Sequence, residues 1–449
     1  MAVAIVGAGV TGLTIALQLA RAGKAVTVLE RDPQVGGLAK TFRYGETFFD
    51  VGPHRFHTED ERVAAFVGEA IGGELLEIPR VSAVQAFGVL HSWPLRARVL
   101  LSLPPRLLFR CAADALRRER PGGDSFEDEI VRRYGRTLYE TFFAPYTRRF
   151  LDRDPADLHR DWARAGVDRA VIDRRVEASG LISLLRGALR PVETSFLYPR
   201  SGVGRFAEAL AAEVTALGGT IHLGACVDAL EVRGQRVVSV GAGARRVACD
   251  GVIWTGPIGR ALRLLGEDAP ALEFRSTVLF NVEVRRPALL PHQWIYFGGG
   301  ESFVRISHPT AFSPDAAPPG SSGICAEVTC REGDELWSDP SRRTAAVLDD
   351  LVAAGALASR GDVSDLHLER VADTYPVYTI GHREELRRAL RAVSRWENLL
   401  VAGRCGRFWY NNMDHSIAQG LAIAREIQAG RALSDVDVGE REFWTQRSA

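Results

Sequence analysis

Two histidines, three residues apart, follow a Gly-Pro pair in the stretch DVGPHRFHT at residues 50–58. Imidazole side chains in a loop can ligate a metal, act as a base or support a binding loop. The i, i+3 spacing beside a proline, with no third histidine or cysteine nearby, is poor geometry for a metal site. We therefore expect no metal here. We interpret His54 and His57 either as direct participants in a reaction or as groups that hold their loop, which Asp50 fixes.

The N-terminal segment AVAIVGAGVTGLTIALQLARAGKAVTVLE is typical of a strand, a glycine turn, a helix and a second strand. Gly7 permits the tight turn, Gly9 lets the backbone approach a pyrophosphate, and Gly12 allows close packing of helix on strand. The anion would lie at the helix N-terminus. Glu30 ends the second strand, where a carboxylate can accept the hydroxyl groups of an adenosine ribose. These residues predict a dinucleotide site.

Composition places the chain among ordinary globular proteins. Its 449 residues suggest about three domain-sized units, and 46% hydrophobic with 25% charged residues indicate neither disorder nor a fibrous structure. The formal net charge of zero gives no electrostatic reason to expect nucleic acid or an anionic membrane as a partner. The cysteines show no zinc spacing, no membrane-length apolar run occurs in the sequence, and we interpret the apolar run that starts at residue 2 as a strand and not as a signal peptide. We expect a cytoplasmic protein with a small-molecule substrate.

A second glycine pair, Gly36 and Gly37, follows Glu30 in ERDPQVGGLAKTF. Together with DGVIWTGP at 250–257 and NLLVAGRCGRFWYNNMDHSIAQGLAIAREI at 398–427, it resembles the FAD-dependent amine-oxidase-like superfamily. In the last segment a strand delivers Gly403, and Asp414 and Ser416 can cap a helix whose N-terminus would face the electron-rich edge of a flavin. The resemblance implies FAD as the cofactor. The further cofactor contacts that it implies are Arg31, Leu38, Gly52, His54, Val227, Thr255, Gly256, Arg404 and Met413.

The same resemblance implies an α/β fold in which two insertions interrupt a Rossmann-like FAD-binding domain. We expect the FAD-binding domain at 1–85, 200–265 and 390–435, a helical domain at 86–199, an antiparallel β-sheet substrate domain at 266–389, and a C-terminal tail at 436–449. Residues 125–150 have helical spacing, with Ser125 and Asp128 as an N-cap pair. Short apolar runs such as STVLFNVEV and GICAEVTC favour strands in the second insertion. A substrate would lie between this sheet and the flavin.

Within the superfamily the chain most resembles the UDP-galactopyranose mutases. The patches that carry this resemblance are FDVGPHRFHT at 49–58, LYETFFAPYTRR at 138–149, VIWTGPI at 252–258, LEFRS at 272–276 and GRCGRFWYNNMD at 403–414. It implies an isomerase of carbohydrate biosynthesis that interconverts the pyranose and furanose forms of a nucleotide-activated sugar, through attack of the N5 atom of reduced flavin on the anomeric carbon. Arg275 is at the position of an arginine that meets the diphosphate, Tyr410 at that of a phosphate-binding tyrosine, and His54 and His57 fall on the loop beside the flavin.

Departures from the mutase pattern keep an oxidoreductase open. Leu151 stands where the mutases have tryptophan, Asn412 stands where a carboxylate is expected, and FLYPRSGVGRF at 196–206 replaces a stretch with paired aspartates. The segment at 196–206 of this chain resembles protoporphyrinogen-oxidase-like flavoproteins. The alternative is therefore an FAD-dependent oxidoreductase such as an amine oxidase or a desaturase. A homodimer also stays open. The candidate anion contacts, which a solvated face explains equally well, are Arg148, Arg149 and Arg205.

Overall fold

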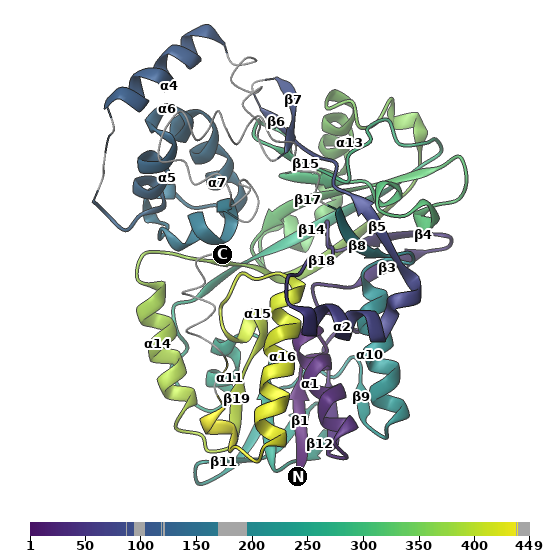
Figure 1. The fold of residues 1–449 in the computed structure, drawn as a ribbon, viewed down its shortest axis with the longest axis vertical. Helices are drawn as coiled ribbons and strands as arrows, with labels where there is room; N and C mark the ends of the chain where they lie inside the picture. Colours follow the sequence, from purple (N-terminus) through teal and green to yellow (C-terminus); the bar gives the residue numbers. More distant parts are fainter. Residues whose placement is uncertain are drawn as a thin grey trace.

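The computed structural model describes residues 1–86, 88–93, 104–117, 119, 122–168, 195–436 and 438. Parts of the expected helical domain, 94–103 and 169–194, lie outside the described residues, as does nearly all of the expected tail from 436 onward. Figure 1 shows three regions: a parallel sheet with its helices at the bottom, a second sheet at the upper right, and a group of helices at the upper left.

A five-stranded parallel sheet forms the lower region (Figure 1). In spatial order its strands are β19 (Leu399–Val401), β13 (Gly251–Trp254), β1 (Ala2–Val6), β2 (Ala25–Leu29) and β9 (Thr220–His222). The central strands β1 and β13 are nearly continuous apolar runs that are buried along their length, as in parallel strands covered on both faces. All five strands present their carboxyl ends at the same edge, where sheets of this kind bind ligands.

The helices of this region bring distant parts of the chain together. Helix α1 (Val10–Arg21) packs against α16 (Met413–Gln428) and α10 (Gly204–Ala216), and α2 (Glu61–Ile71) packs against α10 and α16. The contact between α1 and α16 is close, because a Cβ added at Gly420 would lie 2.8 Å from the Cβ of Thr14. Apolar side chains of α1, α10, α16, β1 and β2 form one core cluster. The start of α16 is thereby held beside the start of α1.

The second sheet has seven strands in the order β18, β14, β17, β16, β15, β6, β7. Their bounds, in the same order, are Val363–Val377, Glu273–Val284, Ser322–Cys330, Arg305–Ser307, Trp294–Phe297, Ser82–Ala86 and Val89–Trp93. Side chains alternate across β14, so that Val278 and Phe280 pack in one core cluster with α13 (Thr344–Ala353), whereas Thr277 and Leu279 line a cavity on the other face. One face of this sheet is therefore a wall of the site described below.

The structure corrects the expected domain plan in two places. Strands β6 and β7, at 82–93, belong to the seven-stranded sheet, although we expected 1–85 in the FAD-binding domain and 86–199 in the helical domain. Strand β6 also pairs with β15 in parallel, so this sheet is not wholly antiparallel. The reason is physical: a short hairpin whose partner strand lies far along the chain carries no local signal of the sheet that it joins.

The helices at the upper left of Figure 1 are α4 (Pro105–Arg117), α5 (Phe126–Tyr134), α6 (Arg136–Leu138) and α7 (Ala144–Leu151), with a wider π-helical turn at Tyr139–Phe143. The predicted N-cap pair is confirmed. The Ser125 hydroxyl accepts a hydrogen bond from the Asp128 backbone N–H at 3.0 Å, and the Asp128 carboxylate accepts one from the Ser125 backbone N–H at 3.4 Å. This reciprocal pair fixes where α5 begins.

Smaller elements complete the described chain. The hairpin of β3 (Thr41–Tyr44) and β4 (Thr47–Asp50) leads into the histidine loop, and β5 (Leu75–Pro79) pairs with β8 (Ser195–Pro199). The other strands and helices are β10 (Ala229–Arg233), β11 (Arg236–Ala242), β12 (Arg245–Ala248), α11 (Ile258–Leu264), α12 (Glu335–Ser338), α14 (His382–Val393) and α15 (Gly403–Gly406). Across the described ranges, no helix combines the length and the apolar character that a membrane crossing needs.

Candidate active site

A cavity of about 550 Å³ lies between the two large sheets. Its wall combines the carboxyl ends of β1, β2 and β13, the start of α16 and one face of β14 and β18. This volume suits an organic ligand. The expected site residues that line it are Gly7, Gly9, Gly12, Glu30, Arg31, Gly36, Gly37, Leu38, His54, His57, Val227, Thr255, Gly256, Gly403, Arg404, Tyr410, Asn412, Met413, Asp414 and Ser416. Gly52 and Arg275 do not line it.

The glycine turn brings backbone to the cavity where side chains would not fit. A Cβ added at Gly12 would lie 2.2 Å from the carbonyl oxygen of Gly7, and one added at Gly37 would lie 3.1 Å from the Cα of Gly9. Gly9 precedes α1 without a side-chain cap, and the first turn of α1 holds no acidic residue. The free N–H groups and the positive end of the α1 dipole are therefore left for an anionic ligand.

Glu30 links the glycine turn to the end of β2. Its carboxylate accepts hydrogen bonds from the backbone N–H of Ala8 at 2.6 Å and of Asp32 at 2.9 Å. Burial raises the pKa of Glu30, since only 6% of the residue is exposed. Each carboxylate oxygen accepts one backbone bond and keeps a lone pair, which suits it to a ribose hydroxyl.

The start of α16 differs from the expectation. Helix α16 begins at Met413 after Asn412, and no side chain caps it, so Asp414 and Ser416 are not capping residues. Both lie inside the first turn, where the Ser416 hydroxyl accepts a hydrogen bond from the Asn411 amide at 3.1 Å. The N–H groups at this helix end are consequently free of side-chain caps. A second positive helix end therefore faces the cavity.

These features fit a flavin adenine dinucleotide better than a smaller ligand. The uncapped start of α1 suits a pyrophosphate, and the carboxylate of Glu30 suits the ribose of its adenosine half. The second uncapped helix, α16, suits the electron-rich pyrimidine edge of a flavin. The two ends come from chain segments about 400 residues apart, which α1 and α16 hold together.

Asp50, at the start of the histidine loop, anchors the loop through the hydrogen bonds of its side chain. The Asp50 carboxylate accepts hydrogen bonds from the Thr41 hydroxyl at 2.6 Å, the Tyr198 hydroxyl at 2.7 Å and the Val203 backbone N–H at 3.1 Å. Further along the loop, Phe56 exchanges two backbone hydrogen bonds with residue 197 of β8. The expectation that Asp50 fixes this loop is confirmed.

Asp50 also predicts a pH effect on stability. Burial raises the pKa of Asp50 to about 6, above the value of about 3.9 in an unfolded chain. The protonated form is therefore favoured on folding, so its contribution is complete below about pH 4 and is lost as the pH rises through 6. We expect the free energy of unfolding to fall by about 2–3 kcal/mol more from pH 4 to 7.5 in the native chain than in Asp50→Asn. Urea denaturation at both pH values measures this, and equal changes in the two proteins would contradict it.

The two histidines differ in their surroundings. His54 is partly buried, and burial, followed by the charges of Arg404 and Arg305, lowers the pKa of His54 to about 4. Its imidazole is therefore neutral at neutral pH. His57 is exposed but lines the same cavity. A neutral ring beside two cations can donate or accept one hydrogen bond without adding a third positive charge.

The sheet side of the cavity carries a buried ion pair. Arg305 on β16 donates hydrogen bonds to Glu327 on β17 at 2.5 and 2.6 Å, and one to the Tyr375 hydroxyl at 3.0 Å. On the α16 side, the guanidinium of Arg404 lies 4.3 Å from the ring centroid of Tyr410 and donates to the Thr374 carbonyl at 2.5 Å. These bonds lock both guanidinium groups in place.

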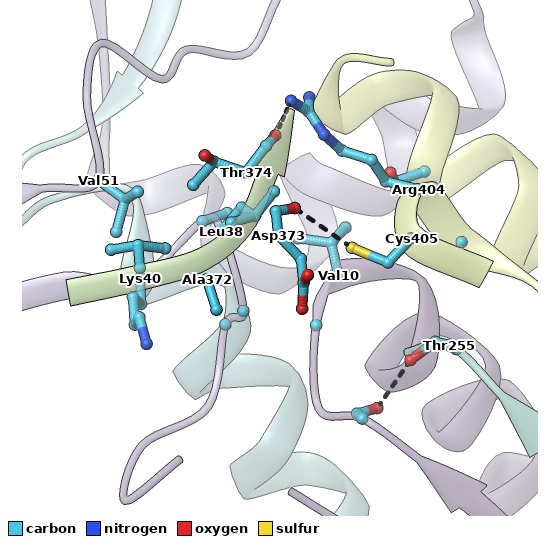
Figure 2. Close-up of a pocket in the computed structure, with 18 of the residues that line it drawn as sticks. Val10, Leu38, Lys40, Val51, Thr255, Ala372, Asp373, Thr374, Arg404 and Cys405 are labelled. Carbon is cyan, nitrogen blue, oxygen red and sulfur yellow. Dashed lines mark hydrogen bonds between the residues drawn. The ribbon is translucent and has the colours of Figure 1, made fainter. Parts of the chain in front are cut away.

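A bulge in β18 reaches toward the cofactor side of the cavity. Opposite β14, the paired residues of β18 jump from Tyr375 to Val371, so Ala372–Thr374 loop out of the ladder. Asp373 has a left-handed φ of 56°, and its carboxylate lies 3.6 Å from the Arg31 guanidinium. Figure 2 shows this segment between Leu38 and Lys40 on one side and Arg404 and Cys405 on the other. Sequence analysis did not identify Asp373 as a site residue.

Arg275 lies outside the cavity wall, which does not fit its expected role at a diphosphate. Arg275 pairs with Tyr375, which lines the cavity, but Arg275 itself does not line it, in contrast to Thr277 and Leu279 further along β14. It is 4% exposed and donates to Asp152 at 3.3 Å. Arg275 is thus held in a contact with the C-terminal end of α7 and not in the cavity wall.

Gly52 and the three arginines that we expected to bind an anion also lie outside the cavity wall, where each makes a structural contact. Gly52, with φ of +70°, makes room for the buried pair, since an added Cβ would lie 3.0 Å from both Arg305 and Glu327. The three arginines expected as anion contacts do not line the cavity. Arg148 pairs with Asp154, Arg149 with Glu301 and the carbonyl groups of Phe297 and Gly299, and Arg205 with Glu74.

Sequence analysis missed five of the cavity arginines, which are Arg55, Arg80, Arg260, Arg305 and Arg370. Arginine supplies all but two of the 56 basic residues, so residue type alone does not single out any of them. The available signal was position, because Arg55 stands between the two histidines of the loop. Arg55 is recognised as a candidate ligand contact only when the hydrogen-bond and ion-pair partners of each cavity arginine are known.

One group of side chains away from the cavity has the composition of a metal site. His159, Asp161 and His382 are buried, and their ligand atoms lie within 4.8 Å of one another. Both oxygens of Asp161, however, accept hydrogen bonds from Arg383 at 2.6 Å. The group is a charge-balanced contact between residues 159–161 and α14.

The family model described as flavin containing amine oxidoreductase matches residues 10–428. Among curated proteins, the chain is 26% identical to the phytoene dehydrogenase of Streptomyces griseus over 380 residues, which are 71% of this chain and 70% of that protein. It is 34% identical to the probable UDP-galactopyranose mutase of Klebsiella pneumoniae over 166 residues, which are 34% of this chain and only 42% of that protein.

Two solved structures have the same fold. The crystal structure of a reduced UDP-galactopyranose mutase superposes with a TM-score of 0.84 at 21% identity, over 98% of both chains. A putative protoporphyrinogen oxidase from Exiguobacterium sp. 255-15 superposes with a TM-score of 0.75 at 20% identity, over 96% of this chain and 99% of that one. At such identities these likenesses show the fold alone. They confirm the predicted α/β fold class and the resemblance to the mutases.

The family match and the cavity agree on the cofactor. The matched region begins at Val10, the first residue of α1, and includes the whole of α16; the uncapped starts of these two helices face the cavity. The predicted cofactor, FAD, is confirmed. The chain belongs to the family of flavin-containing amine oxidoreductases.

Proposed function

We propose that the protein is an FAD-dependent isomerase that interconverts the pyranose and furanose forms of a nucleotide-activated sugar. The observation that carries the proposal is that the histidine loop at 50–58 and the YNNMD segment at 410–414, both similar to the mutases, line one cavity. The fold likeness to a reduced UDP-galactopyranose mutase over 98% of both chains supports it, as does the partial match to the Klebsiella protein.

In this proposal each wall of the cavity has a separate task. Reduced FAD, when bound, supplies an electron-rich nitrogen nucleophile for a glycosyl carbon. The chain's own arginines stabilise the negative charge of a departing diphosphate, and their fixed positions avoid a reorganisation cost. Aromatic side chains such as Tyr296 and Tyr410 exclude water and hold the sugar near the flavin. The neutral ring of His54 holds one polar group of the cofactor or the sugar.

We also propose the domain roles that go with this chemistry. Residues 1–81, 200–265 and 390–435 bind FAD, and the seven-stranded sheet, with β6 and β7 included, supplies the substrate wall. The helical region closes one side, because Ala165 also lines the cavity. Carbohydrate biosynthesis is the setting that fits such an enzyme.

A specific observation favours a second candidate, an FAD-dependent oxidoreductase. The match to a phytoene dehydrogenase covers 71% of the chain, twice the share covered by the mutase match. In that case the cavity would hold a substrate that loses a hydride to oxidised flavin. The two candidates differ in the flavin state that each requires.

The test is anaerobic turnover of the FAD-loaded protein with a panel of nucleotide sugars, with and without dithionite. The proposal expects an isomerised sugar only when the flavin is reduced. Chromatography separates the ring forms. Bleaching of oxidised flavin by a compound that is not isomerised would contradict the isomerase and support the oxidoreductase.

A further inference from the structure

Arg55 and Arg80 differ from the other arginines that line the cavity. Arg55 makes no hydrogen bond or ion pair with any described residue, and Arg80 makes one hydrogen bond, to the Ser82 hydroxyl at 3.1 Å. The others are held by acceptors: Arg31 by Asp373, Arg260 by the Val227 carbonyl, Arg305 by Glu327, Arg370 by the Trp337 carbonyl and Arg404 by the Asn411 carbonyl. Two guanidinium groups therefore keep nearly all their donors unused.

The two groups converge on one indole. The guanidinium carbon of Arg55 lies 5.0 Å from the ring centroid of Trp294, and that of Arg80 lies 5.3 Å from it. Trp294 is 1% exposed and is fixed in β15, where it pairs with Ser82 and Ser307. Cation–π contact orients both cations but leaves their charges intact. The indole is a rigid platform for a doubly positive site.

Within the part of the chain that the structure describes, neither Arg55 nor Arg80 forms an ion pair, although Asp414 is near enough to act on the charge of Arg55. Among the described residues, none brings a carboxylate oxygen within 4.0 Å of either guanidinium. Four acidic groups of the cavity wall lie beside other side chains: Asp32 pairs with Lys40, Glu327 with Arg305 and Asp373 with Arg31, and Asp414 lies 3.2 Å from His415. Burial lowers the pKa of Arg80 to about 10, and the charge of Arg55 lowers it further in the same direction.

The location indicates which part of a ligand meets this pair. Arg55 directly follows His54 in the loop beside the flavin-facing helix end, and Asp414 in the first turn of α16 is close enough to act on its charge. Arg80 stands at the entry to β6, next to the strand that carries Trp294 and Tyr296. The pair thus lies beside the histidine loop, the first turn of α16 and the second sheet, which is the wall that the proposed function assigns to the substrate.

We propose that Arg55 and Arg80 form an anion-binding site for the substrate, which presents a phosphate or carboxylate group to both guanidinium groups over Trp294. Phosphate and carboxylate groups both present several anionic oxygens close together. A guanidinium group can bind two such oxygens through two parallel hydrogen bonds. The inference deepens the proposed function by naming the anionic part of its substrate. The experiment below measures binding of the anion and not turnover. The anion-binding proposal can therefore fail while the isomerase proposal stands, and the reverse.

The experiment is calorimetric titration of the FAD-loaded protein with three probes: UDP, galacturonate, and galactose as the neutral comparison. Arg55→Met and Arg80→Met are each expected to weaken binding of the recognised anion by about 10- to 100-fold, because a charge-assisted hydrogen bond is lost. A UDP response identifies a phosphate ligand, and a galacturonate response identifies a carboxylate ligand. Galactose binding is expected to be insensitive to either substitution.

The matched control is Arg246→Met, because Arg246 lies on β12 outside the cavity and pairs with Glu231 at the surface. It should leave all three affinities unchanged. FAD content of each variant shows whether the fold is kept. Where a methionine variant loses FAD, Arg→Lys at the same position replaces it, with partial retention of anion affinity expected. Unchanged affinity for both anions in all Arg55 and Arg80 variants, or no anion binding by the native protein, would overturn the proposal.

Discussion

Replacing Gly12 by alanine is expected to yield protein that retains less than about a tenth of its FAD. The added Cβ would lie 2.2 Å from the Gly7 carbonyl oxygen and 3.5 Å from a methyl group of Ile5, and the first contact is with backbone. This clash can be avoided only if α1 moves away from the turn. Such a movement displaces the N–H groups at the start of α1 that would bind the pyrophosphate. Overpacking of this kind costs about 1–3 kcal/mol before any loss of ligand binding is counted. The flavin-to-protein absorbance ratio measures the effect.

The control for this substitution is Gly68→Ala in α2. Gly68 is exposed, and an added Cβ would meet no atom within 4 Å. Alanine should therefore retain FAD and stabilise the helix by up to about 1 kcal/mol. Full FAD content in Gly12→Ala would show that the turn does not depend on close backbone approach, and the account of the cofactor site would then be wrong.

The largest loss of stability is expected from breaking the pair of Arg305 and Glu327. Glu327 is 3% exposed and holds Arg305 through two hydrogen bonds, so Glu327→Leu leaves a guanidinium buried without a counter-charge. Removing one member of a buried pair typically costs about 3–5 kcal/mol. Urea denaturation of the FAD-loaded protein measures the free energy of unfolding.

The double variant Arg305→Met with Glu327→Leu separates charge from packing. It removes both ions, so it should recover most of the stability that Glu327→Leu alone loses. The surface pair of Arg246 and Glu231 is the comparison, where Glu231→Gln should change the free energy of unfolding by less than about 1 kcal/mol. A double variant as unstable as the single one would mean that shape, and not charge, dominates at this position.

The cofactor half of the site could be predicted from sequence because its signals are local. The strand, turn, helix and second strand around Gly7, Gly9 and Gly12 occupy one continuous segment, and Glu30 is fixed at its end. The cap at Ser125 is also local, since both members lie within four residues. Each of these features depends on the chemistry of neighbours in the chain.

The substrate half could not be predicted because it depends on pairing between distant strands. Arg275 is outside the cavity wall and donates a hydrogen bond to Asp152, a residue 123 positions away, and no pattern within LEFRS contains that information. The two guanidinium groups of Arg55 and Arg80 are seen to lie together, without an ion pair to any described residue, only when β15 places Trp294 beside both of them. Sequence showed the arginines but not which of them lack a counter-ion.

The most direct test of the isomerase is the redox state of the flavin during turnover. Under strictly anaerobic conditions, the FAD-loaded protein is reduced once with dithionite, the excess is removed, and a nucleotide sugar is added while the flavin spectrum is recorded. The account predicts many isomerised molecules per flavin with the spectrum still that of reduced flavin at the end. Product limited to one equivalent per flavin, or a net change in flavin oxidation state that matches the product formed, would contradict it.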